Sequence, residues 1–245
     1  MIRLSIIIPT KNEEAHLPAL LDSIRRQSFT DYEVIVADNH SSDRTVEIAK
    51  ASGARVVAGG MPGPARNKGA LQAKGSLLLF LDADAVLTSE TYLEDMLREF
   101  DEQKADVATC ILRPVSAKII DQVFYGAYNA FAQLTERFRP HAAGTCILVR
   151  RHMHEGLKGF DEEVVLGEDM DYVQRAAKDG ARFRLLKKSG PVDVSVRRFE
   201  KDGRWGVVFK YLFGELHMLV KGPIKKIPFT YEMGGPEKKK PKKTS

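Results

Sequence analysis

The sequence predicts an α/β protein built on a doubly wound, mostly parallel sheet. Short apolar runs alternate with amphipathic, helix-like stretches through the first half of the chain, at roughly 20 to 30 residues per repeat, which is typical of successive βαβ units. The run at 77–81 has five apolar residues with no polar alternation, as expected of a parallel strand buried on both faces.

Four strands and three helices are expected before residue 84. In the first helix, Leu17, Leu20 and Ile24 recur at helical spacing. Asn12 suits the N-cap of this helix, and Pro18 is tolerated only near its start. The predicted strands are 4–8, 34–36, 55–57 and 77–81, and the predicted helices begin near residues 13, 42 and 65.

Beyond residue 84 the alternation becomes less regular, and we expect a mixed sheet in this half. The stretch 192–199 alternates apolar and polar residues, as a half-buried strand does. The other predicted elements are helices at 90–102, 117–138 and 168–178 and strands at 106–112, 145–149 and 182–186.

The composition is that of a folded globular protein. The chain has 245 residues, of which 43% are hydrophobic and 29% charged, enough for one large domain with an extension. Cys110 and Cys146 form neither a CxxC pair nor a disulfide framework, and the N-terminus lacks the pattern of a secretory signal, so we expect a cytoplasmic location. The predicted division is an α/β domain at 1–200, an amphipathic helical extension at 201–232 and a basic disordered tail at 233–245.

The positive charge is concentrated at the C-terminus. Residues 221–245 contain eight lysines and two glutamates, a net charge of +6, whereas the whole chain carries +5. The preceding segment, 207–220, is rich in large apolar residues but too short to span a bilayer. Packing in the core or in a homodimer is one expected fate of this segment. The other is peripheral contact with an anionic membrane, because each nearby lysine contributes about 1 kcal/mol to such binding.

Three predicted strands end in polar residues: 9–13, 38–39 and 82–84. In a parallel sheet these ends share one edge, where α/β proteins bind ligands. Asp82 and Asp84, spaced i, i+2, offer the carboxylate oxygens that Mg²⁺ or Mn²⁺ uses with substrate phosphates. A simple turn is the alternative. The chain has no G-x-G-x-x-G in its first βα turn and no P-loop motif, which excludes those two nucleotide sites.

Together, these segments resemble family 2 glycosyltransferases, which have the GT-A fold. The resemblance covers about residues 3 to 200, with the motifs in the family's order and spacing. The matching segments are Ser5-Ile-Ile-Ile-Pro-Thr-Lys-Asn-Glu-Glu14, Val36-Ala-Asp38, Pro64-Ala-Arg-Asn-Lys-Gly69, Leu79-Phe-Leu-Asp-Ala-Asp84 and Gly167-Glu-Asp169.

The resemblance implies a site for a nucleotide-diphospho-sugar donor. Asp82 would help to hold the donor, and Asp84 would coordinate the Mg²⁺ or Mn²⁺ ion that bridges its diphosphate. Taken alone, Asp38 is also a common turn residue, and Arg66 would be expected to be a solvated helix residue. The other donor-binding residues would be Pro9, Thr10, Glu13 and Asp38 at the base and ribose, with Arg66 at the diphosphate.

The resemblance also implies a catalytic base and an acceptor side. Glu168 and Asp169 match the acidic pair of inverting members, in which the second acid is the base, so Asp169 is favoured; plain charge at a helix start is the alternative. Gly144 would allow close backbone approach, and His141 is expected to be an exposed loop histidine or, at best, an acceptor contact. Arg197 and Arg198 would contact phosphate, although alternating strand arginines usually face solvent.

The sequence-based hypothesis is therefore an inverting, metal-dependent glycosyltransferase that acts on an acceptor hydroxyl, such as that of a glycan or glycolipid. One alternative is a polyprenyl-phosphate glycosyltransferase at the membrane surface. A second is a non-catalytic, membrane-associated binding protein. Nucleic acid is not expected as a partner, because the basic tail has few aromatic residues and no recognisable binding motif.

Overall fold

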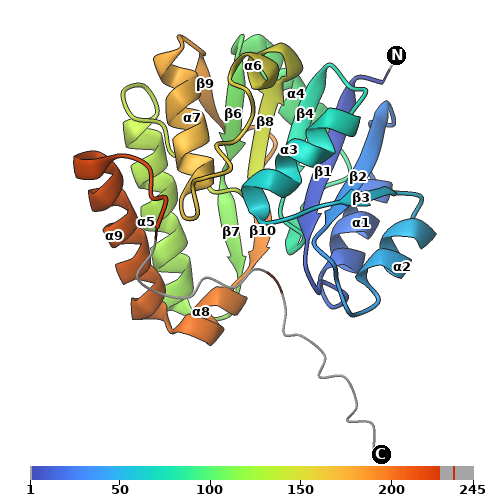
Figure 1. Cartoon of the computed structure of the whole chain (residues 1–245), viewed down its shortest axis with the longest axis horizontal. Coiled ribbons are helices and arrows are strands. Elements are labelled where there is room, and N and C mark those ends of the chain that lie inside the picture. Colours follow the sequence, from blue (N-terminus) through green and yellow to red (C-terminus); the bar gives the residue numbers. More distant parts are fainter. Residues whose placement is uncertain (1, 227–233, 235–245) are drawn as a thin grey trace, which may run out of the picture.

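The computed structural model describes residues 2–226 and 234, and it shows a central sheet covered by helices on both faces (Figure 1). The mixed α/β architecture with a mostly parallel sheet is the one predicted. The helices are α1 (Leu17–Arg25), α2 (Thr45–Ala51), α3 (Pro62–Gln72), α4 (Tyr92–Glu102), α5 (Ile119–Thr135), α6 (Arg151–Gly156), α7 (Glu168–Lys178), α8 (Arg197–Asp202) and α9 (Arg204–Lys221).

The main sheet has seven strands in the order β3-β2-β1-β4-β8-β6-β9, and a small sheet has the order β5-β10-β7. The first four strands along the chain are parallel, whereas β8 runs antiparallel to both β4 and β6. The predicted mixed character of the second half is thus confirmed. The strands are β1 (Leu4–Thr10), β2 (Tyr32–Asp38), β3 (Arg55–Ala58), β4 (Leu77–Leu81), β5 (Ala85–Leu87), β6 (Val107–Cys110), β7 (Leu112–Val115), β8 (Cys146–Arg150), β9 (Phe183–Leu186) and β10 (Val192–Ser195).

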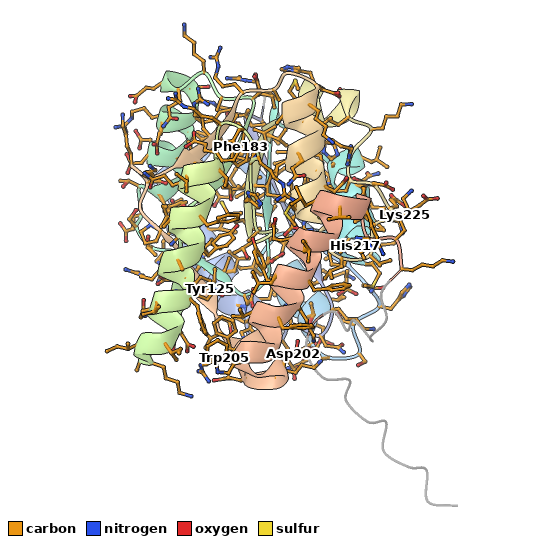
Figure 2. All side chains as sticks on the ribbon, turned by 90° about the vertical axis from the view of Figure 1, so that its left-hand side faces the viewer. Tyr125, Phe183, Asp202, Trp205, His217 and Lys225 are labelled. Carbon is orange, nitrogen blue, oxygen red and sulfur yellow. The ribbon has the colours of Figure 1, made fainter. Side chains whose placement is uncertain are left out.

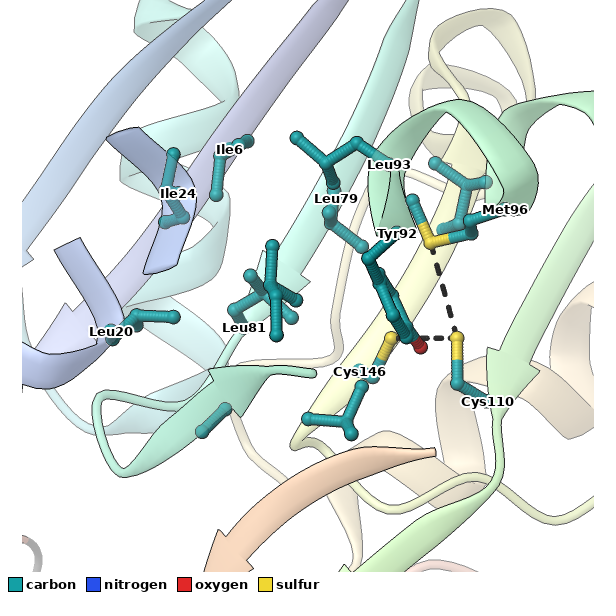
Figure 3. Close-up of a cluster of buried hydrophobic side chains, with 14 of the residues drawn as sticks. Ile6, Leu20, Ile24, Leu79, Leu81, Tyr92, Leu93, Met96, Cys110 and Cys146 are labelled. Carbon is teal, nitrogen blue, oxygen red and sulfur yellow. Dashed lines mark hydrogen bonds between the residues drawn. The ribbon is translucent and has the colours of Figure 1, made fainter. Parts of the chain in front are cut away.

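Two apolar cores lie on opposite faces of the main sheet, because successive strand side chains point to opposite faces. One core packs α1 and α4 against β1 and β4, and Figure 3 shows Leu20, Ile24 and Met96 around Leu79 and Leu81. The other packs α3 and α7 against the same strands. All five residues of β4 are buried, as its unbroken apolar run predicts.

Three local predictions before residue 113 were wrong. The first helix begins at Leu17 rather than near Glu13, with Pro18 in its first turn. Asn12 does not cap it, because this residue has a φ of 52° and its side-chain oxygen accepts the Ser42 N–H at 2.8 Å. The strand expected at 106–112 is two strands, β6 and β7, which belong to different sheets.

The strand expected at 192–199 ends at Ser195. The Ser195 hydroxyl accepts the N–H of Arg197 at 3.2 Å, and the chain then turns into α8. Arg197 therefore begins a helix instead of alternating along a strand. This change in direction matters for the site, because it aims the Arg197 side chain back at the edge of the main sheet.

In the C-terminal part, α9 packs against α5 at one end of the molecule (Figure 1). The helix predicted in 201–232 is therefore present over 204–221, whereas its assignment as a separate unit stays a prediction. Apart from Gly234, the predicted tail at 233–245 lies outside the described residues. Within the described part of the chain, no helix is long and apolar enough to cross a membrane.

Candidate active site

Asp82 and Asp84 follow directly after β4, at the edge where β1 and β2 also end. The backbone N–H of Asp82 donates to the Thr145 carbonyl at 3.2 Å, which fixes the end of β4 beside the segment that leads into β8. The side chain of Asp82 is 35% exposed and that of Asp84 is 15% exposed. Both carboxylates thus lie at the carboxyl edge of the parallel strands, where the sequence places a ligand site.

Arg66, on α3, is the buried centre of this edge. Its side chain is only 2% exposed, and its terminal nitrogens donate to Asp82 at 2.9 Å, to Glu168 at 2.8 Å and to the Gly144 carbonyl at 3.2 Å. Burial lowers the pKa of Arg66, but the charges of Asp82 and Glu168 more than offset this, and the pKa is raised. Arg66 is therefore a fixed cation shared by two acids, and not a solvated helix residue.

Gly144 must be a glycine because Arg66 occupies the space beside it. A Cβ atom at residue 144 would lie 2.2 Å from Nη2 of Arg66 and 3.0 Å from its Cζ. The close backbone approach that the sequence suggested for Gly144 is thus made by this chain's own guanidinium.

Glu168 and Asp169 stand at the start of α7, as predicted. The Asp169 carboxylate accepts the Gly144 N–H at 2.5 Å and the Met170 N–H at 2.8 Å. Burial and the charge of Glu168 raise the pKa of Asp169 to about 7, although Arg66 and these two N–H donors oppose the shift. Asp169 thus has the pKa that suits a general base near neutral pH.

A second arginine closes the other side of this edge. Arg197 donates to both oxygens of Glu13, at 2.6 and 2.8 Å, and its Nε lies 2.9 Å from Asp84. Burial raises the pKa of Asp84; Arg197 opposes this shift, and the charges of Asp82 and Glu13 add to it. Arg198 follows on α8; burial and Asp84 raise the pKa of Tyr125, and the charge of Arg198 opposes this rise.

The other predicted donor residues lie at the ends of β1 and β2. Asp38 accepts hydrogen bonds from the Thr10 hydroxyl at 2.9 Å and from the Ser41 N–H and hydroxyl at 2.9 and 2.6 Å. Pro9 pairs in register with Ala37 on β2. Asp38 and Thr10 are buried, so these contacts shape the turn at the sheet edge.

His141 is not the exposed loop histidine that the sequence suggested. It is 1% exposed, because its ring is held between the Thr135 hydroxyl, at 2.9 Å from Nδ1, and Glu215, at 3.0 Å from Nε2. His141 therefore joins the end of α5 to α9, three residues before Gly144.

The model of glycosyl transferase family 2 matches residues 5–157, which is more than half of the chain. The chain belongs to this family. Among curated relatives, the poly(ribitol-phosphate) β-N-acetylglucosaminyltransferase TarS of Staphylococcus aureus is 30% identical over 198 residues, which cover 76% of this chain and 34% of that protein. The glycosyltransferase EpsJ of Bacillus subtilis is 27% identical over 201 residues, covering 74% of this chain and 58% of that protein. The chain thus spans about a third of the length of TarS.

Solved structures show that this family 2 chain has the GT-A fold. The structure of TarS residues 1–349 with UDP-GlcNAc superposes with a TM-score of 0.63 at 24% identity, covering 79% of this chain and 58% of that one. The mannosyltransferase PcManGT of Pyrobaculum calidifontis, in complex with GDP-Man and Mn²⁺, gives a TM-score of 0.65 at 20% identity, covering 79% and 56%. The fold class predicted from the sequence is confirmed.

The family implies a divalent metal, and the acids at this edge fit one. The described residues contain no group of three His, Cys, Asp or Glu side chains that could hold a metal alone. Mg²⁺ and Mn²⁺ sites in phosphate-binding proteins commonly use one or two carboxylates plus substrate oxygens, which matches Asp84 with Asp82 nearby. In this structure the cation paired with Asp84 is the guanidinium of Arg197, whose Nε lies 2.9 Å from the carboxylate.

Sequence reasoning missed Tyr125 in this family 2 site. Burial and the charge of Asp84 raise its pKa to about 12, which places the phenol beside the acidic edge. Asp121, Tyr125, Tyr128 and Ala132 recur at i, i+4, i+7 and i+11 along α5, and this spacing is the signal for an inward face.

Proposed function

We propose that this chain is an inverting, metal-dependent glycosyltransferase that moves a sugar from a nucleotide-diphospho-sugar to an acceptor hydroxyl. One observation carries the proposal: Arg66 bonds both to Asp82, on the donor side, and to Glu168, beside the candidate base Asp169. A single buried guanidinium thus holds together the donor-side acid and the acid next to the candidate base. This arrangement supports the positioning that a displacement between two substrates requires.

The donor would bind at the carboxyl ends of β1, β2 and β4. Thr10, Glu13 and Asp38, with Pro9, would border the nucleoside, and Arg66 and Arg197 are the cations near its diphosphate. Asp84 would hold the Mg²⁺ or Mn²⁺ ion, which when bound would offset charge on the departing nucleoside diphosphate, and Asp82 would contact the donor. The complexes of TarS with UDP-GlcNAc and of PcManGT with GDP-Man and Mn²⁺ support a donor and a metal of these classes.

Asp169 would take the proton from the acceptor hydroxyl. The acceptor oxygen then bonds to the anomeric carbon from the face opposite the diphosphate, and the carbon–oxygen bond to the diphosphate breaks with its electron pair. A pKa of about 7 leaves Asp169 largely ionised at slightly alkaline pH while still basic enough to accept a proton. General-base catalysis of this kind contributes about 10²- to 10⁴-fold in rate.

The pKa of Asp169 favours a hydroxyl acceptor over the alternative, a polyprenyl phosphate. A phosphate is already ionised at neutral pH and has no proton for Asp169 to remove. The lysine-rich residues 221–245 suit either acceptor if it is linked to a lipid, since they would bring the domain to an anionic membrane surface from the cytoplasmic side.

Isothermal calorimetry with UDP and GDP, with and without Mn²⁺, tests the donor site. We expect one of the two to bind with Mn²⁺, and its Kd to rise at least tenfold in Asp84→Asn. Asp22→Asn, at an exposed position on α1, should bind as the wild type does. If neither UDP nor GDP shows metal-dependent binding, the proposed donor site is contradicted, and the non-catalytic alternative gains support.

Asp169→Asn tests the base separately from the donor. We expect donor hydrolysis, with water as the acceptor, to fall by about 10²- to 10⁴-fold, because the amide cannot accept the proton. The Kd of the nucleoside diphosphate should change by less than about threefold, because base catalysis and donor binding are separable effects. An unchanged hydrolysis rate would exclude Asp169 as the base.

A further inference from the structure

The two longest helices, α5 and α9, contain few buried residues. Only Gly214 is buried among the 18 residues of α9, and only Asp121, Ala132 and Thr135 among the 17 of α5. By contrast, α4 buries six of its 11 residues. Most of the surface of α5 and α9 is therefore not used to build the core.

The exposed side of α9 is apolar along its whole length. The residues Trp205, Phe209, Leu212, Leu216 and Leu219 recur at i, i+4, i+7, i+11 and i+14, which places them on one face of the helix. Each of these side chains is between 61% and 72% exposed. An amphipathic helix normally turns such a face towards a core, and this one turns it away.

The outer side of α5 is apolar as well. Ile119, Val123 and Leu134 are 80%, 59% and 75% exposed, and Phe138, just beyond the helix, is 74% exposed. Between them, the exposed positions 126, 127 and 130 are glycine or alanine. We call this stripe and the stripe on α9 together the α5–α9 surface.

The two stripes belong to one fixed pair of helices. Arg204 donates to both oxygens of Asp121, at 2.6 and 2.9 Å, near the start of each helix. The rings of Tyr128 and Tyr211 meet edge to face, with centroids 5.8 Å apart, and His141 bonds to Glu215 near the far end. Figure 2 shows both helices side by side at the surface, facing the viewer. A partner would therefore meet both stripes at once.

We propose that the α5–α9 surface docks onto an anionic lipid bilayer. Apolar patches of this extent mark interaction sites, and helices with aromatic and leucine faces next to basic residues lie in the membrane interface. The sequence that follows α9 is basic, since 221–245 carries eight lysines against two glutamates, and Lys221 is the last residue of α9 itself. A second copy of the chain is the less favourable occupant, because each copy would add the net charge of +6 that 221–245 carries in sequence.

The proposed docking does not depend on the proposed function, but it would orient the candidate active site relative to the bilayer. The Glu215–His141 contact joins the rear of this surface to the segment that carries Gly144 and thus to Asp169. A bilayer at the α5–α9 surface would therefore lie on the acceptor side of the site and away from α1 to α3, at the other end of the molecule (Figure 1). This geometry fits an acceptor that is anchored in the same bilayer.

Co-sedimentation with phosphatidylglycerol vesicles and with phosphatidylcholine vesicles tests the surface on the full chain. We expect the wild type to bind the anionic vesicles and to bind the zwitterionic vesicles at least tenfold more weakly. Leu212→Glu/Leu216→Glu and Val123→Glu/Leu134→Glu should each weaken binding at least tenfold, because a charge is placed on one stripe or the other. Leu71→Glu is the matched control, because Leu71 on α3 is 80% exposed and lies outside this surface. It should bind as the wild type does.

Every substituted side chain is exposed, so we expect the variants to fold. Circular dichroism and nucleotide calorimetry on the same variants check this. Equal vesicle binding by wild type and both double variants would overturn the proposal. So would a dimer in solution, seen by sedimentation velocity, that both double variants dissociate, because it would assign the surface to a second copy. Vesicle binding requires no nucleotide, so its failure would leave the proposed transferase activity standing.

Discussion

A globular protein usually buries apolar side chains and exposes charged ones. The sheet edge departs from this by burying charge, and the α5–α9 surface departs from it by exposing apolar side chains. At the edge, charged side chains are buried: Arg66 is 2% exposed and Glu13 is 3% exposed. On the α5–α9 surface, large apolar side chains are in water, and Leu134 is 75% exposed. Buried charges lose their hydration, which costs stability unless they are paired. Apolar side chains that stay exposed contribute no hydrophobic free energy to folding. Both departures occur at the two places where we propose that this chain binds a ligand.

The two regions should therefore respond differently to substitution. Buried charges at the edge are held by several partners each, so removing one leaves others unpaired. Side chains on the α5–α9 surface have few partners to lose. The following predictions test this difference, beginning with the largest expected effect.

Arg66→Met should lower the free energy of unfolding by about 3–5 kcal/mol, because it leaves Asp82 and Glu168 without their shared cation in a partly buried site. Urea unfolding followed by circular dichroism measures this change. Arg55→Met is the control, since Arg55 is 40% exposed and pairs with Glu33 at the surface. Its effect should stay below about 1 kcal/mol. Equal effects from the two substitutions would contradict the central role of Arg66.

Gly144→Ala should destabilise the protein by about 1–3 kcal/mol, because the new methyl group overlaps a guanidinium that three hydrogen bonds hold in place. The matched substitution is Gly126→Ala on α5, where an added Cβ meets no atom within 4 Å. There the change should stabilise the helix by about 0.5–1 kcal/mol. Thermal unfolding compares the two variants, and the same sign for both would contradict the prediction.

The fold could be predicted from local patterns, because each βαβ unit repeats a signal of its own. The buried run of β4 and the polar ends of β1, β2 and β4 were sufficient to place the site at one edge. The inner contacts could not be predicted in this way. Arg66 and Glu168 are 102 residues apart, and Glu13 and Arg197 are 184 apart, so no spacing rule relates the members of either pair.

His141 shows why the acceptor side was harder to predict. A lone histidine in a polar segment resembles a surface residue, and its burial depends on Glu215, which α9 brings to it from 74 positions away. The strand predicted through Arg197 was wrong for a related reason, since an alternating pattern does not reveal where a strand turns into a helix. In both regions the final contacts also join residues far apart in the sequence, His141 with Glu215 and Arg197 with Glu13.

The pH dependence of kcat/KM should report the titration of Asp169. Its pKa is raised from 3.8 to about 7, chiefly by burial, and only the ionised form can accept a proton. The rate should therefore fall about tenfold for each pH unit below 7 and reach a plateau above about pH 8. Steady-state donor hydrolysis from pH 5.5 to 9 measures this profile. The pH profile of the residual activity of Asp169→Asn should lack the change in slope near pH 7. If that change persists in this variant, the titrating group is not Asp169.

The smallest effect is expected on the α5–α9 surface. Leu216→Ala, at a side chain that is 63% exposed on α9, should change the free energy of unfolding by no more than about 0.5 kcal/mol. The same substitution at Leu97, which is 2% exposed on α4, should cost about 2–5 kcal/mol because it removes packed methyl groups and leaves a cavity. Urea titration at several protein concentrations compares them. If Leu216→Ala costs as much as Leu97→Ala, and the cost grows with protein concentration, the surface is packed against a second copy in solution and is not free to meet a bilayer.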